Sequence, residues 1–315
     1  MRRIIAIDAG KFACKAATYN PDGSEKIISF RSKLEETQRA EAQGQSYIVN
    51  YGGKRYLVGE QATEASVSGK TTKSEEVHKI SAYTALGLLA NTDDEIVVAL
   101  GCPLSIYENA VQRKAFKEYM FPAGQTIDVT VNNITKHLKV KSCMIFPESS
   151  GIVHLEPDKY SGDAIGVLDL GGLNLNAVVY SHQMPVLETL FCENLGGNVF
   201  TTELKNALSQ NYGEDIPDWM MSSIIKQGYV TDNLSSNGIL AGSKEFISNF
   251  KEKHIDNILS ICQKHSWNLR FTRLVFVGGS SELFREEIKR KLPAAVIVEQ
   301  PEFANVRGFL KAITE

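Results

Sequence analysis

The chain has 315 residues and carries 34 lysines and arginines against 37 aspartates and glutamates, a formal net charge of −3. At about 150 residues per domain, this length predicts two domains. Hydrophobic residues at 43% and charged residues at 23% exclude disordered, collagen-like and disulfide-scaffold chains. The near-neutral charge argues against direct binding to nucleic acid, which requires a positive field.

The five cysteines are scattered singly, without a CxxC pair or a Cys/His cluster. This pattern predicts reduced thiols in a cytoplasmic protein, most of them small buried side chains. The first apolar run, residues 4–7, ends at Asp8 and is too short for the core of a signal peptide. No apolar run approaches ~18 residues, so we expect no membrane partner.

The first half opens with a predicted meander of three strands, at 4–7, 14–19 and 26–30. Residues 31–79 are polar, with one predicted hairpin of strands 47–49 and 55–58. The rest of this half is predicted as a helix near 80–90, a strand at 96–100, a helix over 105–119, a hairpin at 126–131 and 137–140, and a strand at 141–146.

A polar segment at 158–163 predicts a domain boundary, and the opening pattern then returns. The strand at 164–170 ends in Asp169-Leu170-Gly171-Gly172, as the first strand ends in Asp8-Ala9-Gly10, and strands at 175–180 and 184–192 follow. The repeat predicts a duplicated fold of two similar halves. The remaining predicted elements are helices at 198–208, 217–227 and 243–265, a strand at 274–277, a helix to 291, a strand at 295–298 and a helix at 301–313.

Four glycine turns carry the chemical signal. They are Asp8-Ala9-Gly10, Asp169-Leu170-Gly171-Gly172, Leu195-Gly196-Gly197 and Gly278-Gly279-Ser280. Glycine lets a backbone approach phosphate closely and present N–H donors to it, so this series predicts phosphate binding. The P-loop, the dinucleotide-binding GxGxxG, the protein-kinase signatures, the nucleophile elbow and HExxH are absent from the sequence.

The order of these motifs over the whole chain resembles that of the actin-like ATPase superfamily. Residues 8–16 are similar to its first phosphate loop and 165–174 to its second. Residues 145–151 and 303–308 resemble its connecting segments, and 274–282 its adenosine loop. The short length and Pro147-Glu148-Ser149 are most similar to the plasmid-segregation actins of the ParM/StbA type. The second phosphate loop departs from the family pattern, because Leu173 stands where threonine or serine is usual.

The resemblance implies an α/β fold, the duplicated ribonuclease-H-like architecture of actins, with two domains of two subdomains each around a nucleotide cleft. Domain I is expected to comprise 1–158, with 31–79 as a small outer subdomain and the C-terminal helix 301–315 returning to it. Domain II is expected to comprise 159–300, with an outer subdomain at about 198–265.

Phosphoryl transfer needs a metal ion, donors around the phosphates and a group that orients water. Asp8 and Asp169 are therefore predicted to be catalytic residues that hold Mg²⁺, and Glu148 to orient the attacking water. Lys15 is expected to neutralise phosphate oxygens. The other predicted nucleotide-binding residues are Gly10, Lys11, Phe12, Ala13, Gly171, Gly172, Leu173, Asn174, Gly196, Gly197, Lys226, Gly278, Gly279 and Ser280.

The function implied by the resemblance is hydrolysis of ATP to ADP, or of GTP, coupled to head-to-tail polymerisation. The filament is expected to segregate plasmid DNA through a DNA-bound adaptor of the ParR type, without touching nucleic acid or membrane itself. Two alternatives stay open. One is a monomeric small-molecule, sugar-type kinase of the same superfamily, and the other is a nucleotide-dependent scaffold without turnover.

Overall fold

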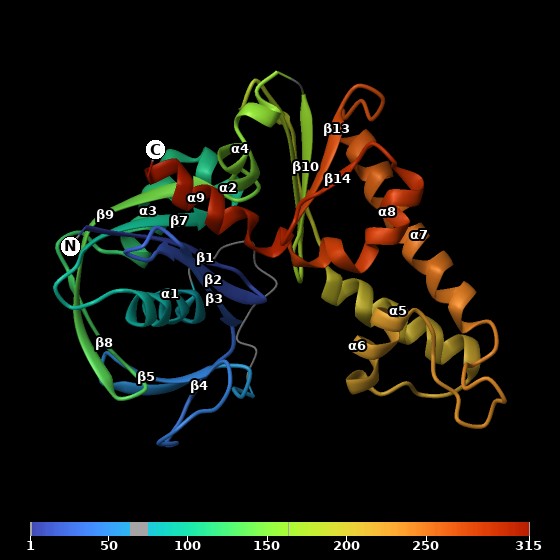
Figure 1. Cartoon of the computed structure of the whole chain (residues 1–315), viewed down its shortest axis with the longest axis horizontal. Coiled ribbons are helices and arrows are strands. Elements are labelled where there is room, and N and C mark those ends of the chain that lie inside the picture. The colour runs from blue at the N-terminus through green and yellow to red at the C-terminus, as the bar shows by residue number, and fades with distance from the viewer. Residues whose placement is uncertain (1, 64–74, 163, 315) are drawn as a thin grey trace. The chain divides into compact units, whose positions relative to one another are not determined.

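The computed structural model describes residues 2–63, 75–162 and 164–314, which form two compact units (Figure 1). The first unit comprises Met1–Pro157 and Phe303–Glu315, and the second comprises Asp158–Glu302. Part of the predicted outer subdomain, residues 64–74, lies outside the described residues. Within the described ranges, no helix is both long and apolar enough to cross a membrane.

The first unit is built on a nine-stranded sheet of order β3-β2-β1-β7-β9-β8-β5-β6-β4. Its elements are β1 (Arg2–Ala9), β2 (Ala13–Tyr19), β3 (Glu25–Arg31), β4 (Leu34–Glu36), β5 (Ser46–Tyr51), β6 (Lys54–Gly59), α1 (Glu76–Leu89), β7 (Glu95–Cys102), α2 (Leu104–Glu108), α3 (Ala110–Met120), β8 (Thr126–Val131), β9 (Ile134–Pro147), α4 (Gly151–Leu155) and α9 (Ala304–Thr314).

Alternation along β1 explains why helices cover both faces of this sheet. Ile5 and Ile7 pack in the cluster that includes α1, whereas Ala6 packs in the cluster that includes α9. Successive side chains of a strand point to opposite faces, so one strand serves both cores. The face under α9 also carries Ala17 and Ala99, and these small side chains let Phe309 lie close to the sheet. Figure 1 shows α1 and α9 on opposite sides of β1.

The outer hairpin of β5 and β6 extends the same sheet. Its link to the rest is short, because β5 pairs with β8 at Val49 and Asn50. Ile48, Leu57 and Ala62 form a small core of their own. The polar segment thus contains a local hydrophobic cluster, to which β4 adds a third strand by pairing with β6.

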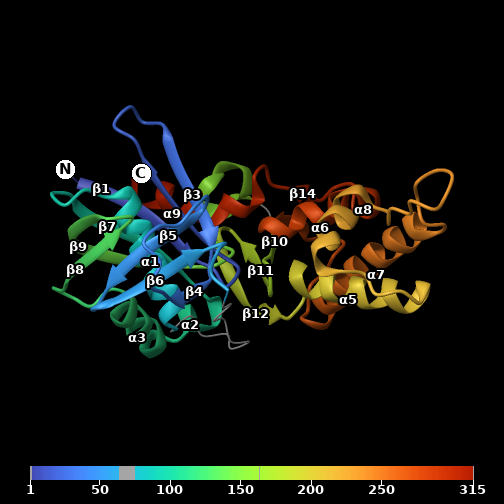
Figure 2. The same cartoon turned by 90° about the horizontal axis from the view of Figure 1, so that it is seen from below.

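The second unit has a five-stranded sheet of order β12-β11-β10-β13-β14. Four of its α-helices pack into one apolar cluster with Leu168 and Leu170, and α5 and α7 run side by side (Figure 2). The elements are η1 (Asp158–Tyr160), β10 (Ile165–Leu170), β11 (Leu175–Ser181), β12 (Met184–Glu193), α5 (Gly197–Tyr212), α6 (Asp218–Gln227), α7 (Ser243–Lys264), β13 (Arg273–Val277), η2 (Gly279–Phe284), α8 (Arg285–Lys291), β14 (Val296–Ile297) and η3 (Pro301–Phe303).

The predicted repeat is confirmed by the strand order. In the first unit β3-β2-β1 is an antiparallel meander, and β7 and β9 then add in parallel. In the second unit β12-β11-β10 is the antiparallel meander, and β13 and β14 add in parallel. The fold is therefore a duplicated α/β architecture, as the sequence predicts.

Two element predictions were wrong in detail. The single helix expected over 105–119 is two helices, because Asn109 interrupts it and its side-chain oxygen caps α3 by accepting from Val111 and Gln112 N–H groups. The two strands expected at 137–140 and 141–146 are one strand, β9. The three-residue strand β4 and the five-residue helix α4 were not predicted.

Candidate functional site

The turn between β1 and β2 is held by residues at the end of β3. The Gly10 carbonyl accepts from Ser32 Oγ at 2.5 Å, and the Phe12 carbonyl accepts from Ser32 N–H at 3.0 Å. In a trans peptide the carbonyl and N–H point in opposite directions. The Lys11 N–H therefore points away from Ser32, toward the outer side of the turn. A Cβ at Gly10 would lie 2.6 Å from the Ala13 carbonyl oxygen, so the turn requires glycine there.

Arg31 reinforces this turn from the same strand. Its guanidinium lies 3.7 Å from the centre of the Phe12 ring, and its Nε donates to the Phe12 carbonyl at 3.2 Å. Phe12 is 37% exposed. Neither Arg31 nor Ser32 was predicted from sequence, because their contacts join residues about 20 positions apart and follow no local motif.

Asp8 lies at the base of the same turn and is nearly buried. It pairs across the antiparallel ladder with Lys15. Directly opposed residues lie on one face with Cβ atoms about 4.5–5.5 Å apart. The first unit therefore places an aspartate and a lysine on one face of the sheet, next to each other beside the turn.

Glu148 follows the last residue of β9, in a segment with an unusual backbone. Its N–H donates to the Cys102 carbonyl at 2.8 Å, which ties the ends of β9 and β7 together. Ser149, the next residue, is fully buried and has a φ of 71°. A left-handed conformation at a residue other than glycine costs about 1–3 kcal/mol and is typical of functional segments. The sequence shows Ser149 only as part of the Pro147-Glu148-Ser149 motif, because its φ angle cannot be predicted from the residue type.

The helix after Glu148 packs closely on α9. A Cβ at Gly308 would lie 1.8 Å from the Gly151 carbonyl oxygen, and a Cβ at Gly151 would lie 2.3 Å from Asn305 Cα. The two predicted connecting segments thus meet within the first unit, and their contact fixes the helix that follows Glu148.

In the second unit, the turn after β10 is bound to the first turn of α5. The carbonyls of Gly171, Gly172 and Leu173 accept from the N–H groups of Gly197, Asn198 and Gly196 at 3.0, 2.7 and 2.9 Å.

The N–H groups that follow these carbonyls point away from α5. They belong to Gly172, Leu173 and Asn174. Successive N–H groups with one orientation form a concavity suited to an anion. The turn can thus supply donors through its backbone even though Leu173 offers no hydroxyl.

A third loop, after β13, closes on the same turn. Ser280 Oγ donates to the Gly171 carbonyl at 2.9 Å. Gly278 has a φ of +83°, and a Cβ there would lie 2.5 Å from Asp169 Oδ1. A Cβ at Gly197 would lie 2.3 Å from Ser280 Oγ. The structure therefore brings together the predicted residues of three separate loops: Asp169, Gly171, Gly172, Leu173, Asn174, Gly196, Gly197, Gly278 and Ser280.

The comparisons with known proteins agree with this arrangement. Residues 6–151 match the family model described as the actin-like proteins N-terminal domain. A solved filament of Alp12 is 24% identical, covers 99% of this chain and 98% of its own, and superposes with a TM-score of 0.76. The chain has the actin-like fold.

Other actin-like structures match over similar lengths. The archaeal actin homologue Ta0583 in complex with ADP is 18% identical with a TM-score of 0.77, and the match covers 100% of this chain and 99% of that one. A 15-stranded ParM filament from Clostridium botulinum is 19% identical with a TM-score of 0.74, covering 99% and 98%. No curated protein matches this sequence significantly.

Two side chains among the predicted nucleotide-binding residues take no part in the hydrogen bonds that join the three loops. The Asn174 side-chain amide donates to Cys192 Sγ at 3.3 Å, so its orientation is set by strand β12. Lys226 is exposed in the last turn of α6, and the hydrogen bonds that join the three loops do not include it. Among the described residues, no three His, Cys, Asp or Glu side chains are grouped as a ready metal site.

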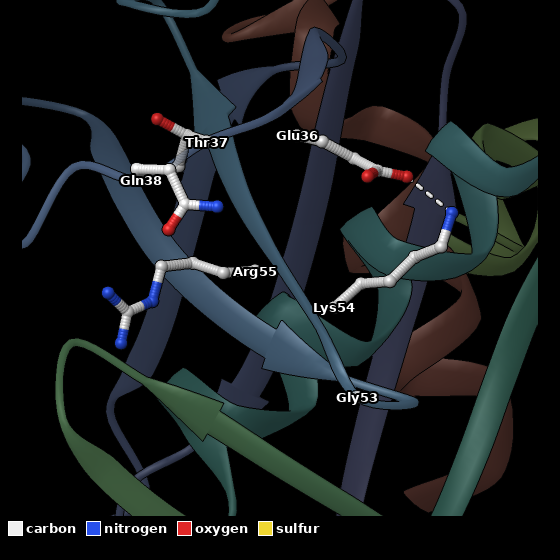
Figure 3. A pocket seen from close by; sticks show the side chains of 6 residues that line it. All are labelled: Glu36, Thr37, Gln38, Gly53, Lys54 and Arg55. Atoms are coloured by element: carbon white, nitrogen blue, oxygen red, sulfur yellow. Dashed lines mark hydrogen bonds and ion pairs between the residues drawn. The ribbon is translucent and has the colours of Figure 1, made fainter.

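A hollow of about 280 Å³ lies apart from the predicted residues, at the turn between β5 and β6 (Figure 3). Lys54 forms an ion pair with Glu36 there, and Arg55 donates to Asn50 at 3.1 Å. These paired, exposed groups favour no particular ligand. The lining residues are Glu36, Thr37, Gln38, Gly53, Lys54 and Arg55.

Proposed function

We propose that this actin-like protein binds and hydrolyses ATP and assembles into filaments. The observation that carries the proposal is the anchored turn at Gly172, Leu173 and Asn174. The preceding carbonyl of each of these peptides, from Gly171, Gly172 and Leu173, accepts an N–H at the start of α5, so the N–H groups at 172–174 are oriented for an anion before any ligand arrives. Pre-oriented donors of this kind are what a transferring phosphoryl group requires.

The relatives support both parts of the proposal. The archaeal homologue was solved with ADP, and the Alp12 and Clostridium botulinum ParM structures are filaments. An open filament needs a head-to-tail contact between copies of the chain, which repeats without closing. The sequence resemblance to plasmid-segregation actins favours a role in the cytoplasm, where a ParR-type adaptor would join the filament to plasmid DNA.

The residues present fit a magnesium nucleotide. Mg²⁺ is usually held by one or two carboxylates together with phosphate oxygens. Asp8 and Asp169 are each nearly buried beside a turn, and we propose that they hold the metal. The bound ion would neutralise phosphate charge. Lys15 would add positive charge beside Asp8, and Glu148 would orient the attacking water.

The test follows light scattering and phosphate release together on purified protein with Mg²⁺ and ATP, GTP, ADP or no nucleotide. We expect scattering to rise above a threshold protein concentration with a triphosphate, while phosphate is released. Phosphate release without scattering at high protein concentration would instead favour a small-molecule kinase or hydrolase. Neither signal with either triphosphate would overturn the proposal.

Glu148→Gln separates assembly from hydrolysis. The amide keeps the shape of the side chain but removes the negative charge with which Glu148 would orient the water and accept its proton. We expect nucleotide binding and assembly to persist while phosphate release falls roughly a hundredfold, a loss in the usual range for general-base catalysis. The exposed Glu95→Gln, on the neighbouring strand β7, is the matched control and should leave both signals unchanged. Unchanged phosphate release in Glu148→Gln would refute the role of this residue.

A further inference from the structure

A buried histidine of α7 contacts Leu195, which lies two residues before the start of α5. His254 is 6% exposed, and its Nε2 lies 3.2 Å from the Leu195 carbonyl oxygen. The imidazole stacks on Phe284 with 4.9 Å between centroids and meets Phe200 edge-on at 5.2 Å. The ring is thus held from two sides while its polar edge is directed at one backbone carbonyl.

The chemistry of this contact fixes the tautomer. A carbonyl oxygen only accepts, so Nε2 must carry the proton and donate. Burial lowers the pKa of His254 below its ordinary value, and the bond to Leu195 opposes this effect only in part. The ring is therefore neutral near pH 7, and the single N–H on Nε2 is committed to Leu195.

The peptide between Leu195 and Gly196 is held at both ends. Its carbonyl accepts from His254, and its N–H donates to the Leu173 carbonyl at 2.9 Å. Because a peptide is planar, fixing the carbonyl also fixes the direction of the N–H. Leu173 belongs to the turn whose outward N–H groups form the candidate anion site. His254 is therefore connected to that turn by two hydrogen bonds through one rigid peptide.

We propose that His254 is a positioning residue for phosphate binding, which holds the Leu195–Gly196 peptide so that α5 orients the turn at 172–174. The proposal rests on the proposed function, since it assigns a residue to the same nucleotide site. His254 does not touch the ligand in this scheme. A histidine that merely filled the core would need only its ring faces, whereas this role also needs the donor on Nε2.

Three variants separate the donor from the packing. His254→Phe keeps a flat ring against Phe284 but removes the donor, and His254→Gln restores an N–H near the position of Nε2. Ile258→Ala is the matched control, because Ile258 is fully buried on the same helix and has no polar group. The readouts are the dissociation constant for Mg–ADP, the melting temperature and amide hydrogen exchange without nucleotide.

We expect His254→Phe to weaken Mg–ADP binding roughly three- to tenfold, the usual loss for one buried hydrogen bond. His254→Gln should recover most of the affinity. Ile258→Ala should lower the melting temperature at least as much as His254→Phe, yet leave the dissociation constant unchanged. Equal affinity of His254→Phe and the parent protein would overturn the proposal, and so would equal losses in His254→Phe and Ile258→Ala.

Hydrogen exchange keeps this test independent of the proposed function. His254→Phe should accelerate exchange at the Gly196 amide, whose bond to Leu173 depends on the held peptide. If the parent protein binds no nucleotide, the proposed function fails, and the exchange result still decides whether His254 positions the turn. An unchanged Gly196 exchange rate in His254→Phe would refute that positioning role.

Discussion

The two units share one strand order but hold their Asp-x-Gly turns by different means. In the first unit the turn is held mainly by side chains, since Ser32 Oγ donates to it and the Arg31 guanidinium covers Phe12, and the Ser32 N–H adds one backbone donor. In the second unit it is held mainly by three backbone N–H groups at the start of α5, to which Ser280 Oγ adds one side-chain donor. A duplicated topology thus preserves where the turn lies while the anchoring chemistry diverges.

The charges beside the two aspartates differ as well. Asp8 faces Lys15 across the ladder, whereas Asp169 faces Asn176 at the corresponding register. The first unit therefore offers a cation, and the second offers oriented backbone donors. Phosphate recognition uses both kinds of group. The two units thus place different groups beside equivalent aspartates, and four experiments test this difference.

The largest effect is expected from Gly278→Ala, in the loop that follows β13 of the second unit. The new Cβ would lie 2.5 Å from Asp169 Oδ1, at a φ of +83°. Strain and overpacking together predict a loss of about 2–5 kcal/mol in unfolding free energy, measured by urea titration. Gly238→Ala is the control, because its φ is +71° but no atom lies within 4 Å of its Cβ. Equal losses in both variants would contradict the packing argument.

Asp8→Asn and Asp169→Asn test whether the two halves contribute equally. Each change removes a negative charge and keeps the shape of the side chain. If both carboxylates hold Mg²⁺, we expect phosphate release to fall roughly a hundredfold in each, as when one stabilising group is removed from an active site. Phosphate release is measured across a Mg²⁺ titration. A loss of phosphate release in only one variant would show that the two aspartates do not contribute equally.

Lys15→Asn gives the first unit the neutral chemistry of the second. Loss of one charge-assisted contact predicts about tenfold weaker binding of a triphosphate, with a smaller salt dependence. The dissociation constant at two salt concentrations provides the measurement. Lys26→Asn, on the exposed start of β3, should bind as the parent protein does. Identical salt dependence in Lys15→Asn and the parent would argue that Lys15 does not meet phosphate.

The smallest effect concerns Cys192, whose sulfur accepts from the Asn174 amide. It is the exposed cysteine, and the other four are buried. Burial raises the pKa of Cys143 and Cys262 to about 12, so these two thiols stay protonated and unreactive near neutral pH. A thiol reagent should therefore modify Cys192 first, and bound nucleotide should slow the reaction by ordering the turn. Mass spectrometry of the labelled protein identifies the site, and labelling at a buried cysteine first would contradict the prediction.

Much of the fold was predictable because its signals are local. The apolar strands that end at Asp8 and Asp169, and the turns that follow them, are visible as short patterns. One error came where a single polar side chain decided the outcome. Asn109 divides one apolar helical pattern into two helices because its side chain caps the second.

The candidate site was predictable as a set of loops but not as an arrangement. The sequence marks Gly196 and Gly278 as turn glycines, but their reason for being glycine is contact with Leu173 and Asp169. Such contacts join residues far apart in the chain. The hydrogen bond from Ser32 to the Gly10 carbonyl is another contact of this kind, because no sequence motif links these two residues.

The sequence by itself determined the duplicated strand pattern, the position of the Asp-x-Gly turns and the actin-like resemblance, since each depends on neighbouring residues and on period. Only the tertiary structure decided which groups hold those turns: Ser32 and Arg31 in one unit, and α5 with His254 behind it in the other. The physical reason is that a backbone N–H is held in a fixed direction when the carbonyl of the same planar peptide is bound. The group that binds this carbonyl comes from a distant segment of the chain.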